Sequence, residues 1–432
     1  MPKPIVCLSS ALGQFMAAFR PCFSQRQWKY FVIVLLGLIE CEGRRTLRGI
    51  QAVVGEKVSL CGLSRFFSRW QWSPAEVAQI WLSRFRVDLK VSVEAEHQRQ
   101  RDEQEKRRGR PKATVVTSYL IVDDSINLKV CGRKMAGLGR HYANSEGRVV
   151  TGHCLFSGLY VLLDRRCPLQ PRLYRQKSVC EQEGVPFLSK IDLAVQEIEQ
   201  FEPVAGTHTH LLMDSWFHCR KVRRAAQKRG WDVSGGLKCN RTMRLINDDG
   251  SRTWLKLSAY AVQLTSEDWQ QAVWPAQDGN RPVYVHAVQT WIRKLGPTLL
   301  LITCHDPNNP AQSLRYWGST LLDADAQTVI NTLAIRWSIE VFFEDSKDLL
   351  GADHYQLMSA EAILRFWTLI ACLGYFLDEY KALHPQDCTT WGQVRRTIQK
   401  EHQHNLLTWL ENQFNAGSSI KSIELQLAIF SS

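Results

Sequence analysis

Two short apolar runs that each end in carboxylates constrain the fold of this chain most strongly. The first is Ser118-Tyr-Leu-Ile-Val-Asp-Asp-Ser125, and the second is Thr209-His-Leu-Leu-Met-Asp214-Ser-Trp-Phe217. A short apolar run between polar residues is typical of a strand buried inside a sheet. The sequence therefore predicts two buried strands, each with an acid at the end where the strand stops.

Further elements lie between and after these strands. Residues 148–156 and 159–163 read as strands, 187–201 as an amphipathic helix, and 220–229 as a helix with six positive charges and no acid. The resulting order is β, β, β, α, β, α, with acids ending the first and fourth strands. This order predicts an α/β core, and the basic helix is suited to hold phosphates beside an acidic pocket.

A third acid stands on a predicted helix in residues 333–347, which no Gly or Pro interrupts. Arg336, Glu340 and Lys347 are spaced so that they fall near 0°, 40° and 20° around the helix axis at about 100° per residue. All three side chains are expected to leave one face. The alternative interpretation is that Arg336 and Glu340 form only a solvated i,i+4 ion pair. Glu344 is a rival for Glu340, about 80° round from Arg336.

The composition favours a polyanionic partner. Lys and Arg number 54 against 42 Asp and Glu, which gives a net charge of +12. Nucleic acid is the commonest partner of such a chain, and a ribosomal contact or an acidic membrane also fits. No apolar run is long enough for a membrane anchor. The 13 cysteines contain no C-x-x-C pair, which favours a reduced, cytoplasmic protein. Grouping His153-Cys154, His208-x-His210 and His218-Cys219 into a metal site is a minor alternative.

The regions around the α/β core differ in character. Residues 1–95 read as an all-α region whose short helices carry Arg45, Arg48, Arg65 and Arg69, as in a helix-turn-helix-like DNA-binding module; a helical bundle with a basic surface is the alternative. Residues 96–117 read as a basic polar linker that contains Arg108-Gly109-Arg110-Pro111. This segment is similar to minor-groove hooks, although a solvated tether is the alternative.

The C-terminal half continues this organisation. The core is expected to span 118–237 and 313–385, interrupted by a β-rich insertion at 238–312, where residues 253–264, 282–292 and 298–303 alternate as in hairpins. The apolar segment 360–383 predicts a helix packed over the sheet, and 386–432 a helical tail. Tryptophans are plentiful in and beside the insertion. Each is a candidate to stack on an unpaired base or, alternatively, to pack in a core: Trp254, Trp269, Trp274, Trp291 and Trp317.

The spacing Arg336-x3-Glu340-x6-Lys347 and its continuation Leu350-Gly-Ala-Asp-His-Tyr-Gln356 resemble the Tyr-x2-Arg-x3-Glu-x6-Lys signature of one branch of bacterial insertion-sequence transposases of the DDE type. Leu333 stands where that signature has Tyr. The resemblance implies a ribonuclease-H-like catalytic core with Asp124, Asp214 and Glu340 as catalytic acids. Asp123 competes with Asp124, because neighbours on a strand point to opposite faces. The family pattern, an acid directly before Ser or Thr, favours Asp124.

Those acids would hold Mg²⁺, or Mn²⁺ in its place, since hard cations prefer oxygen ligands and two-metal sites serve phosphoryl transfer. The resemblance further implies DNA strand cleavage at element ends and strand transfer, with double-stranded inverted-repeat ends and target DNA as partners. It also implies a homodimer in a synaptic complex, associated with the bacterial nucleoid. Candidate DNA contacts are Arg336, Lys347, Lys238, Arg241, Arg220, Arg224, Arg108 and Arg110. The alternative function is an inactive, domesticated transposase that acts as a DNA-binding repressor, and a nuclease acting on RNA is a third.

Overall fold

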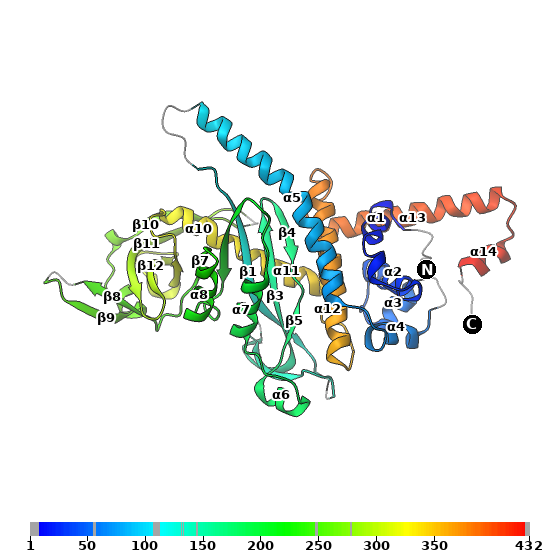
Figure 1. The fold of residues 1–432 in the computed structure, drawn as a ribbon, viewed down its shortest axis with the longest axis horizontal. Helices are drawn as coiled ribbons and strands as arrows, with labels where there is room; N and C mark the ends of the chain where they lie inside the picture. The colour runs from blue at the N-terminus through cyan, green and yellow to red at the C-terminus, as the bar shows by residue number, and fades with distance from the viewer. Residues whose placement is uncertain are drawn as a thin grey trace.

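A single mixed sheet runs through the middle of the computed structural model (Figure 1). The structure describes residues 8–54, 58–106, 113–130, 132, 134–143, 146–246, 249–276 and 279–427. Within them, thirteen strands join in the order β2-β3-β1-β6-β7-β13-β12-β11-β8-β9, with β10 paired to β11 and with β4 and β5 paired to β3. A mixed α/β sheet preceded by helices is compatible with the expected α/β core.

Strand β1 (Val116–Leu128) lies at the centre of the core half of the sheet. It pairs in parallel with β6 (Thr207–Met213) and antiparallel with β3 (Arg148–Leu162), and β6 pairs in parallel with β7 (Asp232–Gly236). The runs Leu120–Val122 and Leu211–Met213 are fully buried, as strands covered on both faces require. Both predicted buried strands are present, and β6 ends at Met213, directly before Asp214. The expected end of the first strand is wrong, because β1 continues past Asp123 and Asp124 to Leu128 through its pairing with β3; the two acids stand where its pairing with β6 ends.

The prediction of two strands between residues 148 and 163 is wrong, because β3 continues without a break through Ser157 and Gly158. A Cβ atom on Gly158 would lie 2.7 Å from the Leu169 side chain, so the missing side chain lets the segment after the strand pack closely. Three short strands pair with β3: β2 (Gly139–Ala143), β4 (Arg165–Pro168) and β5 (Arg172–Tyr174).

Helices cover both faces of this core. Helix α6 (Lys177–Glu183) precedes α7 (Lys190–Gln200), which begins with a capping box made by Ser189 and Asp192, and α8 (Arg220–Lys228) follows β6. Helices α7 and α8 lie on one face, whereas α10 (Ala326–Ile335) and α11 (Trp337–Asp348) lie on the other (Figure 1). The single helix predicted over 333–347 is thus two helices that meet at Arg336.

The insertion extends the core sheet. It contains β8 (Thr242–Ile246), β9 (Arg252–Lys256), β10 (Gln270–Trp274), β11 (Arg281–Ile292) and β12 (Gly296–Cys304). The predicted strand over 253–264 ends early, because Leu257–Ala261 form helix α9, which buries Leu257 and Ala261. Strand β13 (Arg315–Ser319), placed by the sequence in the second core segment, pairs with both β12 and β7 and joins the two halves.

The apolar helix α12 (Ala360–Leu383) is a core helix of the fold. It alone among the described helices is long and apolar enough to span a membrane, and 83% of that apolar window is buried within the protein. It packs against β4, α4 and α5, as the sequence analysis expected for a helix over the sheet. Arg365 near its start is 2% exposed and donates to the carbonyls of Phe67 and Trp72.

Five helices form the N-terminal region: α1 (Ser10–Ala17), α2 (Gln25–Glu40), α3 (Leu47–Val53), α4 (Leu60–Ser68) and α5 (Pro74–Glu105). Because α5 continues to Glu105, the first ten residues of the expected linker 96–117 are helical. Ion pairs from Arg99 to Glu96 and Glu103 support this turn of the helix. The C-terminal region contains α13 (Trp391–Asn415) and α14 (Ile420–Leu427), and short 3-10 helices lie at Arg20–Cys22, Ser266–Asp268 and Pro310–Gln312.

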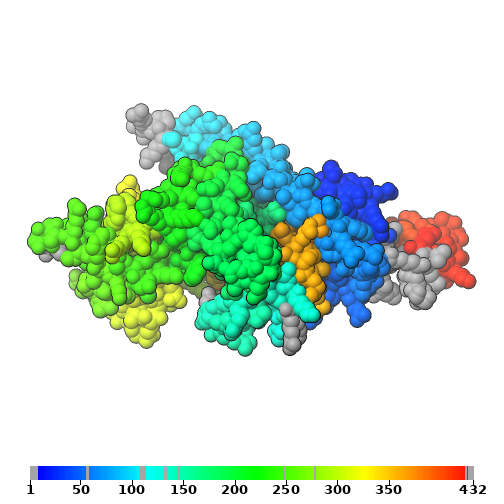
Figure 2. Space-filling view, turned by 60° about the horizontal axis from the view of Figure 1, so that its bottom comes forward, coloured from blue at the N-terminus to red at the C-terminus, as the bar shows by residue number. Residues whose placement is uncertain are grey.

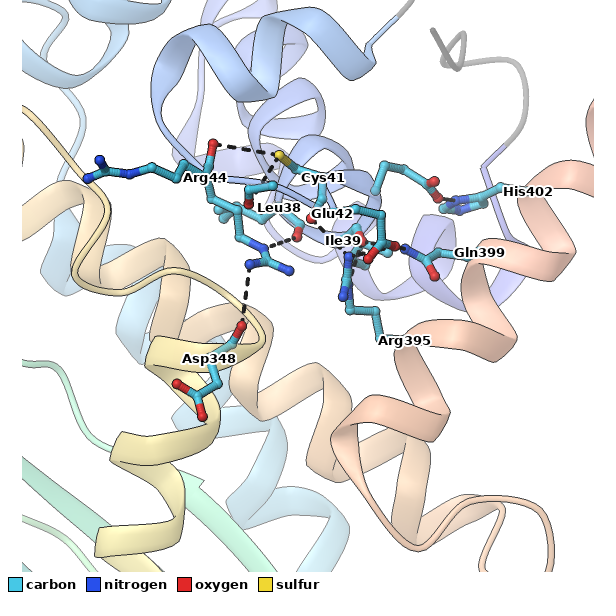
Figure 3. Close-up of polar contacts among 12 residues, drawn as sticks. Leu38, Ile39, Cys41, Glu42, Arg44, Asp348, Arg395, Gln399 and His402 are labelled. Carbon is cyan, nitrogen blue, oxygen red and sulfur yellow. Dashed lines mark hydrogen bonds and ion pairs between the residues drawn. The ribbon is translucent and has the colours of Figure 1, made fainter. Parts of the chain in front are cut away.

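The C-terminal end of α2 joins three distant parts of the chain (Figure 3). Arg395 of α13 donates to the carbonyls of Ile39 and Cys41 at 2.7 and 2.9 Å. Arg45, expected to contact DNA, is instead 4% exposed, and it donates to the carbonyl of Leu38 and to that of Asp348 at the end of α11. Positive side chains here satisfy carbonyl groups that a helix end leaves unpaired. The N-terminal helices are thereby attached to α11 and α13.

Replacing Arg395 with Ala should lower the free energy of unfolding by about 2–4 kcal/mol, because buried carbonyls and the Glu42 carboxylate lose a charged donor. Chemical denaturation measures this loss. The matched control is Arg396→Ala, one residue along the same helix and exposed. Equal stability of the two variants would contradict the structural role of Arg395.

Candidate active site

The adjacent acids that end the buried part of β1 point to opposite faces of the sheet. The Asp124 carboxylate accepts hydrogen bonds from Lys190 Nζ of α7 at 2.7 Å and from Cys154 Sγ at 3.2 Å. The Asp123 carboxylate faces α11, where Arg336 Nη1 lies 3.5 Å from its Oδ2 atom. The pleat of a strand requires this alternation. The structure therefore does not favour the expected choice of Asp124, because its side chain lies on the face away from Glu340.

Arg336 bridges two of the acids on the α11 face. Its Nη2 atom donates to Glu340 Oε1 at 2.5 Å while its Nη1 atom lies near Asp123. The break between α10 and α11 occurs at Arg336 itself, and Glu340 follows in the first turn of α11. The predicted common face of Arg336 and Glu340 is thus present, and it is directed at the end of β1 and not at open solvent.

Asp214 follows the last residue of β6 and is held by its own loop. Its Oδ1 atom accepts hydrogen bonds from the backbone nitrogens of Trp216 and Phe217 at 2.9 and 3.0 Å. Strands β1 and β6 are parallel neighbours, and Val122 lies opposite Met213. The next residue in the chain is an acid in both cases, Asp123 after Val122 and Asp214 after Met213. The register therefore brings Asp123 and Asp214 to the same edge of the sheet.

Burial of these acids perturbs their protonation. Burial, with the Asp214 and Asp124 charges, raises the pKa of Asp123 to about 8, although Arg336 opposes this shift. Burial also raises the pKa of Asp214, again against the effect of Arg336 and of the two backbone hydrogen bonds. Four carboxyl groups, including Glu340, thus share two cations, Arg336 and Lys190. The carboxyl groups outnumber the cations, and at pH 7 the raised pKa of Asp123 keeps most of that carboxyl protonated.

The donor set suits a hard divalent cation. Asp123, Asp214 and Glu340 supply only carboxylate oxygens, the ligands that Mg²⁺ and Mn²⁺ prefer. As the side chains stand, no three acidic, His or Cys groups among the described residues are close enough together to hold a metal ion. On the α11 face the Arg336 guanidinium stands between Asp123 and Glu340.

The histidines considered as an alternative metal site have other partners. His153 contacts the Tyr355 hydroxyl at 2.7 Å, and His210 contacts the Ser234 hydroxyl at 2.9 Å. His218 is bonded to the carbonyl of Gly236, and burial lowers its pKa to about 3. These rings connect neighbouring segments and do not converge on a shared site.

Two positions of the resembled signature are occupied differently here. Leu333 is 2% exposed and packs with Val329 and Ile330, so its place supplies no group to a ligand. Lys347 donates to the backbone carbonyl of Ile126 at 3.2 Å, and burial lowers its pKa. In this structure Lys347 connects α11 to β1, and its phosphate contact stays a prediction.

The other predicted DNA contacts divide between exposed and structural residues. Arg220 and Arg224 are exposed on α8 and line a groove of about 760 Å³ with Lys221 and Lys228. Lys238 is exposed, and its Nζ atom lies 4.7 Å from the centre of the Trp216 ring. Arg241 is instead half-buried and donates to the carbonyl of His218. Arg108 and Arg110 lie outside the described residues.

Sequence reasoning missed several side chains around the acids. Lys190 was not recognised because its contact with Asp124 joins residues 66 positions apart. Trp337, Arg281 and Arg315 were also missed; they line a groove of about 850 Å³ beside Arg336 together with Trp274 and Trp317, which the sequence analysis did name. Trp337 is 54% exposed. Its place directly after Arg336 was the available signal, because an exposed aromatic next to a cation is typical of nucleic-acid sites.

The raised pKa of Asp123 predicts a pH-dependent stability in metal-free protein. The unfolded carboxyl titrates near pH 4, whereas the folded one titrates at about 8. Between these values the folded state binds more protons, so the melting temperature should fall as pH rises from 5 to 8. The amide that replaces the carboxyl group in the Asp123→Asn variant does not titrate, so the melting temperature of this variant should fall less between pH 5 and 8. Scanning calorimetry in EDTA measures the difference, with the exposed Asp323→Asn as control; identical pH profiles for all three proteins would contradict it.

Comparison with protein families agrees with these acids. A family described as DDE superfamily endonuclease matches residues 18–252, and one described as Transposase DDE domain matches residues 189–376. A search of curated proteins found no match. The first match covers more than half of the chain and includes Asp123, Asp124 and Asp214, while the second includes Asp214 and Glu340. The chain therefore belongs to the DDE superfamily of endonucleases, and residues 189–376 are similar to the Transposase DDE domain family.

Proposed function

We propose that this protein is an insertion-sequence transposase that cuts DNA at the ends of its element and joins them to target DNA. The observation that carries the proposal is the contact of Arg336 with both Asp123 and Glu340, next to Asp214, which the register of β1 and β6 places beside Asp123. Asp123 takes the place that the resemblance assigned to Asp124. The strand order β3-β1-β6-β7, with only β3 antiparallel, supports a ribonuclease-H-like layout of the core.

The three acids would hold the divalent metal that DDE enzymes typically use. Held by these residues, Mg²⁺ or Mn²⁺ would polarise the scissile phosphate and lower the pKa of a bound water. For the acids to turn inward together, Arg336 must leave its position between Asp123 and Glu340. A guanidinium so released presents two parallel donors to a phosphate oxygen pair. Arg336 thus balances the acids in the free protein and holds the DNA backbone in the complex.

Exposed cations and aromatics around the acids support a DNA path across this edge of the sheet. The Trp216–Lys238 pair stands directly after Asp214, and Arg220 and Arg224 follow on α8. On the other side of Arg336 lies the groove lined by Trp274, Trp317 and Trp337. Of the tryptophans considered for base stacking, Trp274 and Trp317 are the two that line this groove, so they are the candidates for a base near the cut.

The N-terminal helices are proposed to bind the inverted-repeat ends. Arg48, Arg65 and Arg69 are exposed on or beside α3 and α4, in contrast to the buried Arg45. Attachment of these helices to α11 through Arg45 would hold the bound end in a fixed relation to the acids. A dimer that pairs two ends remains part of the proposal by resemblance to the family.

Replacing Asp123 with Asn, Asp214 with Asn or Glu340 with Gln should reduce cleavage of labelled element ends by more than about 1,000-fold, because each removes a carboxylate that stabilises the transition state through the metal. Binding of the same DNA, measured by gel shift, should persist. Cleavage is followed with Mg²⁺ and with Mn²⁺ on denaturing gels.

Asp124→Asn is the matched control. Its carboxylate accepts hydrogen bonds from Lys190 and Cys154 and would act from outside the metal site. The rate of DNA cleavage is therefore expected to fall by no more than about 100-fold. If Asp124→Asn abolishes cleavage while Asp123→Asn does not, the assignment of Asp123 fails. If wild-type protein binds the ends and leaves them intact with both metals, the repressor alternative replaces the enzyme.

A further inference from the structure

An aromatic and basic ladder lies on the outer face of the insertion, apart from the acids. In β8 and β9, Arg244 is directly opposite Trp254, and Thr242 is opposite Lys256. On the other side of β8, Ile292 of β11 is opposite Met243, which places Trp291 beside Arg244. The Arg244 guanidinium lies 5.3 Å from the centre of the Trp291 ring. Trp254, Arg244 and Trp291 therefore form one row across three strands.

This row faces solvent. Met243, Ile292 and partly buried Leu245 belong to the core beneath the sheet, so the alternate residues of the same strands point outward. Trp254 and Trp291 are 47% and 40% exposed. Two large indole rings left half in water on the strands that flank β8 are uncommon on a surface that serves only to cover a core.

The same face carries positive charge and no acid. Its outward positions on β8 and β9 are Thr242, Arg244, Ile246, Arg252, Trp254 and Lys256. Three cations thus surround the two tryptophans, and all six of these residues are among those described. Flat aromatic surfaces between cations are the arrangement by which sheet surfaces bind unpaired bases and the phosphates between them.

The ladder lies well away from the acid site. Strand β8 is five strand spacings from β6 along the sheet, roughly 24 Å at about 4.8 Å per strand. The β8–β9 hairpin forms one end of the molecule, opposite the end with α13 and α14, as Figures 1 and 2 show. It is also separate from the groove lined by Trp274, Trp317 and Trp337.

We propose that the outer face of β8, β9 and the end of β11 is a second nucleic-acid site that binds single-stranded DNA by stacking bases on Trp254 and Trp291. Arg244 lies between the two rings, over Trp291 and opposite Trp254. Arg252 and Lys256 neutralise the phosphates. Stacking on a π face accepts any base, so the site is tolerant of sequence. The inference rests on the proposed function only in taking DNA as the polymer. It requires neither metal nor cleavage.

The test measures fluorescence anisotropy of labelled 20-residue oligo-dT with the full-length protein in EDTA. The double variant Trp254→Ala/Trp291→Ala should weaken binding by at least about tenfold, since each stacked base contributes separately. The double variant Trp254→Phe/Trp291→Phe retains aromatic faces and should bind within about threefold of wild type. Tyr142→Ala removes a 61% exposed aromatic at the opposite edge of the sheet, on β2, and is the matched control.

The site is supported if the alanine double variant loses affinity for oligo-dT while the phenylalanine double variant and Tyr142→Ala keep it. Should the double variant fold poorly by circular dichroism, Trp254→Ala alone, on the edge strand β9, provides the measurement. The inference is overturned if wild type does not bind oligo-dT, or if the alanine variants bind it as well as wild type. Asp214→Asn must bind oligo-dT normally while failing to cut, which separates this outcome from failure of the proposed function.

Discussion

The structure depends on keeping carboxylates together at the buried ends of two parallel strands. Asp123 and Asp214 repel one another and lose hydration, and the raised pKa values of both record that cost. Arg336 offsets this cost on one face of the sheet by its contact with Asp123, and Lys190 offsets it on the other by its ion pair with Asp124. Because the two cations come from helices far apart in the chain, the helices α7 and α11 must both dock correctly for the acids to be tolerated.

The remaining architecture serves to hold these helices. Lys347 attaches α11 to the carbonyl of Ile126 at the end of β1. Arg45 attaches the end of α11 to the N-terminal helices, and Arg395 attaches α13 to the same end of α2. These three cations, of which the sequence analysis had connected Lys347 and Arg45 with DNA, donate to backbone carbonyls inside the protein. Exposed cations near the acids are those of α8 and the Trp216–Lys238 pair, and others lie on the insertion and on the N-terminal helices.

Much of the core was predictable, because its signals are local. Four apolar residues before Asp123 and three before Asp214 predict buried strands, and the spacing of Arg336 and Glu340 predicts a shared helix face. The missed features depend on long-range packing. Residues 148–162 form one strand because Gly158 lets Leu169 approach, and α5 extends over residues expected to be a linker. The choice between Asp123 and Asp124 rested on a sequence pattern, and the pattern does not record which face of β1 receives α11.

The amino-acid sequence by itself determined the chemistry that this protein has at its disposal: acids at strand ends, a helix with paired charges, a basic surface and a resemblance to DDE transposases. These follow from residue type and periodicity, which act over a few residues. Only the tertiary structure decided which acid of β1 faces α11, that Arg336 stands between Asp123 and Glu340, and that Lys347 and Arg45 donate to backbone carbonyls. The direction of a side chain depends on strand register and on the side from which a distant helix packs, and neither is encoded within the few residues around it.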